Sequence, residues 1–150
     1  MASRRVYLPL VPRSLRWPLV GAVLTTILVF SVVRPPGMGR LNTGPFGVLP
    51  LSTWFHLLGY AGLAVTLAYA LQHSPRPNWQ LLSLVFVLAT AYGVGMELIQ
   101  STLAYRTFDT GDILVNAGVA ALAMAGWNLL CRRVRFYRCQ RLDALRPPVD

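Results

Sequence analysis

The sequence predicts an all-α integral membrane protein, built as a bundle of four transmembrane helices. Its 150 residues are 55% hydrophobic and only 13% charged, which is more apolar than an ordinary soluble domain. Its apolar runs are also long enough to cross a bilayer as helices, which satisfy their own backbone hydrogen bonds in lipid. The expected spans are about 17–33, 51–71, 81–100 and 113–131. They define a transmembrane domain, 17–131, between a basic arm, 1–16, and a basic tail, 132–150.

The connecting segments fit this division of the chain. Pro9 and Pro12 argue against a stable helix in the arm, and Pro18 suits the first turn of the first span, where a backbone N–H has no partner. Segment 34–50 is rich in proline and glycine, a composition that breaks helices and strands, so we expect a loop there. A polar turn at 72–77 then returns the chain after the second span.

The arginines predict the orientation of the bundle. All fourteen basic residues are arginines, and the formal net charge is +9. They cluster at the ends of apolar runs, a pattern that indicates membrane orientation and not a nucleic-acid partner. With the N-terminus inside, eleven of the fourteen lie in cytoplasmic segments, and the other three are Arg34, Arg40 and Arg106. We therefore expect a multi-pass protein of the cell membrane with both termini cytoplasmic and with the loop after the third span facing outward.

Polar residues gather at the outer ends of the last three expected spans. Segment 97–116 holds three of the five acidic residues of the chain around one cation, Arg106. On each span two polar residues lie three or four positions apart and so share a helix face. Together they predict an outward-facing polar pocket. Its expected ligand-binding residues are His56, Tyr60, Glu97, Gln100, Arg106, Asp109, Asp112 and Asn116.

Several chemistries are compatible with this set of residues. Arg106 can clamp the carboxylates in charge-assisted hydrogen bonds or contact an anionic ligand, and the polar residues can also simply solvate a loop. Glu97 and His56 are the candidate catalytic groups, as a general acid or base. Imidazole and carboxylate are suitable ligands for a metal ion, but their spacing matches no metal motif, and Arg106 would compete for the carboxylates. We therefore predict no metal and no cofactor.

The order of the polar residues resembles the VanZ-like family of small membrane proteins. The resemblance rests on Glu97-x2-Gln100-x5-Arg106-x5-Asp112-x3-Asn116, preceded by His56-x3-Tyr60, and covers about residues 51–126. It implies a bundle of about four transmembrane helices in a family named for a protein associated with resistance to the glycopeptide teicoplanin. The chain departs from the family pattern at Ser52-Thr53, where the family often has Asp-Lys, and at Val119, where it has glycine.

The favoured function is binding of an envelope lipid or a lipid-linked envelope precursor in the outward pocket. One alternative is a membrane-embedded enzyme that uses acid/base chemistry on a lipid-linked substrate. The other is a small scaffold whose Ala- and Gly-rich helix faces pack against a protein partner in a larger membrane complex. The basic tail is expected to contact anionic lipid, for which a surface helix is one suitable form.

Overall fold

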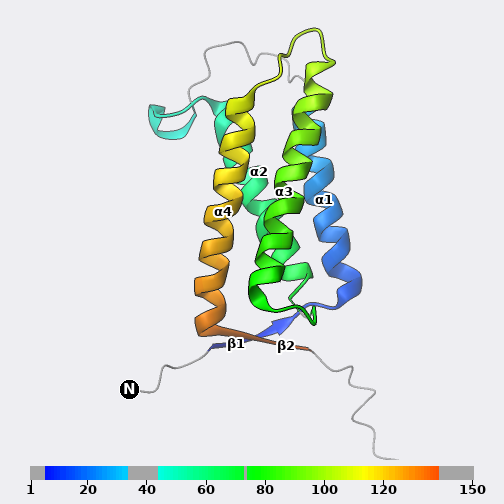
Figure 1. Cartoon of the computed structure of the whole chain (residues 1–150), viewed down its shortest axis with the longest axis vertical. Helices are drawn as coiled ribbons and strands as arrows, with labels where there is room; N and C mark the ends of the chain where they lie inside the picture. The colour runs from blue at the N-terminus through cyan, green and yellow to red at the C-terminus, as the bar shows by residue number, and fades with distance from the viewer. Residues whose placement is uncertain (1–5, 34–43, 73, 139–150) are drawn as a thin grey trace, which may run out of the picture.

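The computed structural model describes residues 6–33, 44–72 and 74–138. Within these ranges four α-helices run side by side and two short strands lie at one end of the bundle (Figure 1). The helices are α1 (Arg13–Val32), α2 (Leu51–Ala70), α3 (Asn78–Ser101) and α4 (Thr110–Arg133). The remaining elements are the strands β1 (Val6–Leu10) and β2 (Val134–Arg138) and the 3-10 turn η1 (Pro45–Gly47). The prediction of a mainly helical chain is confirmed.

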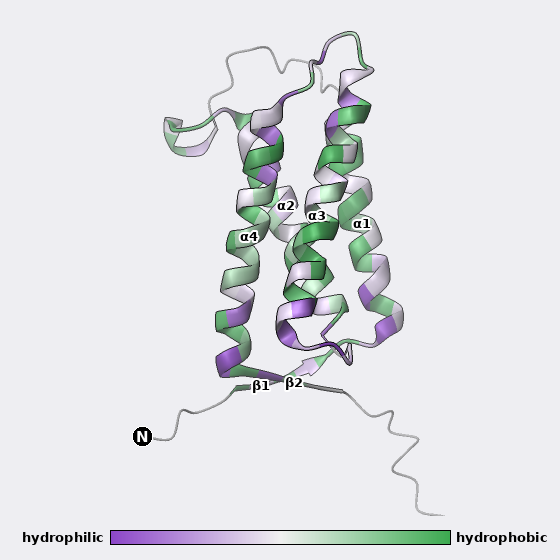
Figure 2. Ribbon diagram, viewed as in Figure 1, coloured by the Kyte–Doolittle hydropathy of each residue, from purple (hydrophilic) through white to green (hydrophobic). Residues whose placement is uncertain are grey.

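All four of these helices are long and apolar enough to cross a membrane. Their outer surfaces carry large apolar side chains: Leu58 is 67% exposed, Leu114 73% and Leu122 74%. Figure 2 shows hydrophobic residues along the length of the helices and hydrophilic residues mostly toward their ends. Leucines exposed on every side of a bundle suit lipid and not water. The described chain therefore has the composition and surface of a multi-pass membrane protein.

Three helices begin earlier than the sequence predicts. Helix α1 begins at Arg13, not at residue 17, with Pro12 as its N-cap. Pro18 is consequently inside the helix, in its second turn, where its ring removes one backbone hydrogen bond. Helix α3 begins at residue 78, directly after Pro77, and α4 begins at residue 110, where the side chain of Asp109 caps its first turn. The apolar runs thus locate the helices, and the helices extend beyond them to Pro12, Pro77 and the capping residue Asp109.

The strands join the two basic ends of the chain, which the sequence did not predict. Strand β1 pairs in parallel with β2, in a register that aligns Val6 with Val134 and Leu10 with Arg138. A surface helix for the tail is therefore wrong over 134–138, because this segment is extended. The rest of the expected arm and tail, 1–5 and 139–150, lies outside the described residues, as do positions 34–43 of the expected loop.

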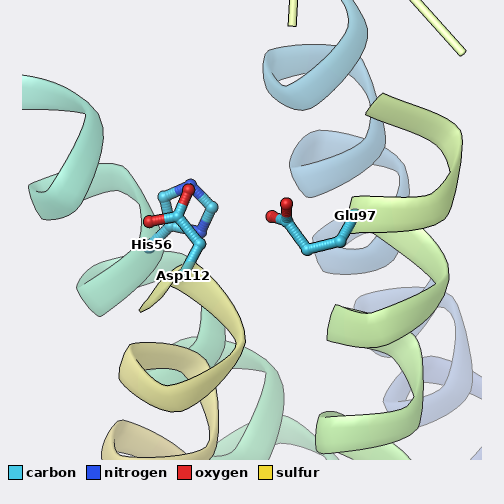
Figure 3. Close-up of side chains that lie close together, drawn as sticks. All are labelled: His56, Glu97 and Asp112. Carbon is cyan, nitrogen blue, oxygen red and sulfur yellow. The ribbon is translucent and has the colours of Figure 1, made fainter. Parts of the chain in front are cut away.

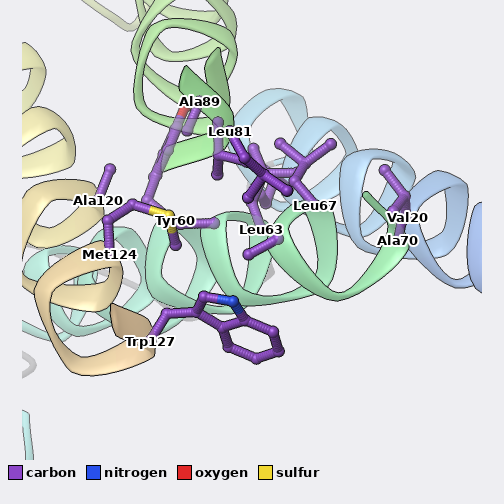
Figure 4. Close-up of a cluster of buried hydrophobic side chains, with 14 of the residues drawn as sticks. Val20, Tyr60, Leu63, Leu67, Ala70, Leu81, Ala89, Ala120, Met124 and Trp127 are labelled. Atoms are coloured by element: carbon purple, nitrogen blue, oxygen red, sulfur yellow. The ribbon is translucent and has the colours of Figure 1, made fainter. Parts of the chain in front are cut away.

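Helices α2 and α3 lie at the centre of the packing, because each of them contacts the other three helices. Figure 4 shows the buried apolar side chains that fill the interior, among them Leu63, Ala89 and Ala120. Gly93 on α3 allows a close approach at the level of the polar residues. A Cβ atom at this position would lie 3.2 Å from the ring of Tyr60 and 3.3 Å from Nδ2 of Asn116. The glycine therefore lets α3 come near α2 and α4 at that level.

Polar groups at the sheet end of the bundle tie the helices together. Arg16 on α1 is 4% exposed, and its Nη1 donates to the backbone carbonyls of Tyr69, at 3.2 Å, and Ala70, at 3.1 Å. These carbonyls belong to the last turn of α2, where carbonyl groups lack partners within the helix. Nearby, Nε1 of Trp127 on α4 donates to Oε1 of Gln72 at 3.3 Å. Side chains thus complete the hydrogen bonding where α2 ends.

Candidate functional site

Three helices bring His56, Glu97 and Asp112 together (Figure 3), at the helix ends that lie opposite the sheet in Figure 1. We call these residues the polar triad. His56 lies near the start of α2, Glu97 near the end of α3 and Asp112 in the first turn of α4. One potential ligand atom from each lies within 4.8 Å of the other two. The up-and-down path of the chain places these three helix ends at one level, as the sequence predicts.

Both ring nitrogens of His56 face residues of α4. Its Nε2 lies 3.4 Å from Oδ2 of Asp112, and its Nδ1 lies 3.1 Å from Oδ1 of Asn116. Asp112 and Asn116 are four residues apart, so one face of α4 offers an acceptor to each nitrogen. The ring of Tyr60 stacks against the imidazole, with centroids 6.1 Å apart and planes 3° from parallel. The histidine is therefore held in one orientation.

Glu97 lies almost completely inside the protein, with 1% of its surface exposed. Its Oε2 accepts the backbone N–H of Asp109 at 3.2 Å. Its Oε1 has no hydrogen-bond partner within the described part of the chain, and neither does the hydroxyl of Tyr60 or Nδ2 of Asn116. Leaving a buried polar group unsatisfied costs about 1–3 kcal/mol, so three such groups at one level call for an explanation.

Two of the predicted ligand-binding residues hold the site in place from outside the triad. The side chain of Asp109 is exposed and accepts the N–H of Gly111 at 2.7 Å, which caps α4. Gln100 is buried, and its Nε2 donates to the carbonyl of Ser31 at 3.2 Å, which ties α3 to α1. The hydrogen bond from the backbone N–H of Asp109 to Glu97 was not predicted, because every residue except proline has a backbone N–H and the sequence does not indicate which one donates.

Arg106 is half-buried in the loop between α3 and α4. Within residues 6–33, 44–72 and 74–138 it forms no ion pair with a carboxylate, and Oδ2 of Asp112 lies instead 3.4 Å from Nε2 of His56. The structure therefore does not show Arg106 acting as a clamp on Glu97 and Asp112. One of the two arguments against a metal ion was that Arg106 would compete for these carboxylates, and this geometry removes it. The other argument, that the spacing matches no metal motif, is unchanged.

The structure thus divides the predicted residues into two groups. His56, Tyr60, Glu97, Asp112 and Asn116 form one polar cluster, whereas Gln100, Arg106 and the side chain of Asp109 lie around it. Comparison of the chain with protein-family models, curated proteins and solved structures gives no match. The resemblance to the VanZ-like family accordingly remains a hypothesis that rests on the order of the polar residues.

Proposed function

We propose that this chain is a VanZ-like protein of the cell envelope membrane whose polar cluster binds the headgroup of an envelope lipid or lipid-linked precursor. The observation that carries the proposal is that three of the unsatisfied buried atoms of the described chain lie in this cluster: Oε1 of Glu97, Nδ2 of Asn116 and the hydroxyl of Tyr60. They offer hydrogen-bond acceptors and donors at the end of an apolar bundle. A headgroup rich in hydroxyl, amide or phosphate groups would complete their hydrogen bonds.

The surroundings of the cluster suit an amphiphile. The helices expose leucines that would contact acyl chains. An apolar groove of about 370 Å³ between α1 and α2, lined by Ile27, Phe30, Phe55 and Leu58 among others, offers further space for a chain. Arg106 carries a positive charge with no ion-pair partner in the described chain, so it is available to an anionic part of the headgroup.

The arginine asymmetry supports an outward location for the cluster, with both termini cytoplasmic. Arg132, Arg133 and Arg135 are exposed at the opposite, sheet end of the bundle, and we propose that they contact anionic lipid of the inner leaflet. The family resemblance would connect such a protein with glycopeptide resistance through its effect on an envelope component.

An enzyme is the second candidate, favoured by the contacts of His56. An imidazole held by Asp112 and Asn116, with the free oxygen of Glu97 facing it, has the parts of an acid/base pair. In such an enzyme Glu97 or His56 would exchange a proton with a lipid-linked substrate. Conversion of a bound lipid would distinguish the enzyme from a binding protein.

Two matched tyrosine variants test the proposed headgroup site. Tyr60 has an unpartnered hydroxyl in the cluster, whereas the hydroxyl of Tyr92 donates to the carbonyl of Leu24 at 2.7 Å. If a headgroup bonds to Tyr60, Tyr60→Phe should weaken lipid binding about tenfold, while Tyr92→Phe should leave it unchanged. Native mass spectrometry of protein purified in mild detergent identifies the retained lipid and measures its affinity. Retention of no defined lipid, or equal affinity in both variants, would contradict the proposal.

A further inference from the structure

The polar triad has the donor types and the spacing of a metal site. Imidazole and carboxylate together suit Zn²⁺ and Mn²⁺, and three protein ligands leave at least one coordination position open. The potential ligand atoms of His56, Glu97 and Asp112 all lie within 4.8 Å of one another. Bonds of about 2.0–2.1 Å at tetrahedral angles separate two ligand atoms by about 3.3–3.4 Å. Nε2 of His56 and Oδ2 of Asp112, at 3.4 Å, already have this separation.

The free oxygen of Glu97 is a second, independent observation. The side chain is 1% exposed, its Oε1 has no partner, and Figure 3 shows the carboxylate pointing toward His56 and Asp112. Two carboxylates therefore face the same small space, and no arginine of the described chain forms an ion pair with either of them. Burying uncompensated negative charge is costly in an apolar bundle. A divalent cation between the two carboxylates would neutralise it.

The contact with Asn116 prepares His56 for such a role. Oδ1 of Asn116 accepts a hydrogen bond, so the proton of a neutral imidazole lies on Nδ1. The lone pair of Nε2 then faces Asp112, an arrangement that is unfavourable unless a proton or a cation lies between the two atoms. In metal sites a hydrogen bond from the other ring nitrogen commonly fixes the tautomer that ligates the metal.

We propose that His56, Glu97 and Asp112 bind one divalent metal ion, Zn²⁺ or Mn²⁺, with Asn116 as the positioning residue for His56. Nε2 of His56, Oε1 of Glu97 and Oδ2 of Asp112 are the ligand atoms. The open position of the ion would accept a phosphate oxygen, which assigns a phosphate-bearing headgroup to the site. This last step rests on the proposed lipid-binding function, whereas the metal site does not.

The metal site is tested on the full chain purified in detergent, stripped with EDTA and then loaded with Zn²⁺ or Mn²⁺. Elemental analysis after desalting should find about one ion per chain in the wild type. His56→Gln and the near-isosteric Asp112→Asn should lose this ion. His73→Gln should keep it, because it changes the only other histidine of the sequence and leaves the triad intact.

A second measurement needs no variant. Saturating metal should raise the melting temperature of the wild type, because an ion that binds only the folded chain stabilises it. The proposed metal site would be wrong if the wild type bound no stoichiometric metal. It would also be wrong if His56→Gln bound as much metal as the wild type. A defined lipid that stays bound in EDTA would overturn the metal-to-phosphate contact and leave the headgroup site standing. Stoichiometric metal with no bound lipid would support the metal site and count against the lipid-binding function alone.

Discussion

The two ends of the helix bundle differ in whether their buried polar side chains have hydrogen-bond partners within the described chain. At the sheet end, Arg16 donates to the carbonyls of Tyr69 and Ala70, and Trp127 donates to Gln72. At the opposite end, buried atoms of Glu97, Tyr60 and Asn116 have no partner within the described chain. Both sets of residues are buried, so burial alone does not separate them.

Whether a buried polar group has a partner in the chain distinguishes residues that stabilise the fold from candidate binding residues. A buried polar group whose partner belongs to the same chain strengthens the fold, as Arg16 does where α2 ends. A buried polar group without a partner weakens the fold unless water or a ligand supplies the missing hydrogen bond. Substitutions should therefore have opposite effects on the stability of the ligand-free protein at the two ends.

The largest effect is expected at the sheet end. Arg16→Ala removes a buried side-chain donor to two carbonyls at the end of α2 and should lower the free energy of unfolding by about 3 kcal/mol. Arg13→Ala is the matched control, because Arg13 is an exposed arginine on the same helix, and it should change stability by less than about 0.5 kcal/mol. Chemical unfolding in detergent measures both. Equal, small losses would contradict a structural role for Arg16.

Sequence patterns predict the helices of this molecule well and its sheet poorly. Long apolar runs separated by polar or proline-containing segments locate all four described helices, because each helix must satisfy its own backbone in lipid. Pairing of β1 with β2 joins opposite ends of the chain, and a local pattern does not reveal such a partner. The alternation of Val134, Arg135 and Phe136 is nevertheless a strand signal, and the buried Val134 and exposed Arg135 fit it.

The effect at the polar triad should be smaller and opposite in sign. Glu97→Gln keeps an oxygen for the backbone N–H of Asp109 and removes a buried charge whose other oxygen is unpartnered. In EDTA and without lipid, the variant should be about 1 kcal/mol more stable than the wild type, although binding is lost. Two measurements test this prediction: the thermal stability of the metal- and lipid-free variant, and the amount of lipid that the variant retains.

Gln100 provides the contrast for Glu97, because it lies one turn away and is also buried. Its amide donates to the carbonyl of Ser31, so Gln100→Met should destabilise the stripped protein by about 1 kcal/mol. If both substitutions destabilise the protein to the same extent, Glu97 is a structural residue like Gln100. The comparison between the two ends of the bundle would then lose its basis.

Helical spacing predicts which residues face the site, but it does not predict where a loop side chain lies. His56, Asp112 and Asn116 come together because their positions on rigid helices follow from the sequence spacing. Arg106 lies in an irregular loop, where nearness in sequence to three carboxylates leaves the direction of its side chain open. The ion pairs expected from that nearness are absent from the described part of the structure.

The smallest effect is therefore expected for Arg106. Without an ion pair to a carboxylate of the described residues, Arg106→Ala should change the stability of the ligand-free protein by less than about 0.5 kcal/mol. Combined with Asp112→Asn, its effect should add to within about 0.3–0.5 kcal/mol, because the two side chains do not pair. If Arg106 instead clamps the carboxylates, its removal leaves them close together and uncompensated, so Asp112→Asn should recover much of the loss. A double-mutant cycle on unfolding in detergent, run beside lipid retention, separates these cases: additive stability with lost retention supports a ligand-facing Arg106, and strong coupling supports the clamp.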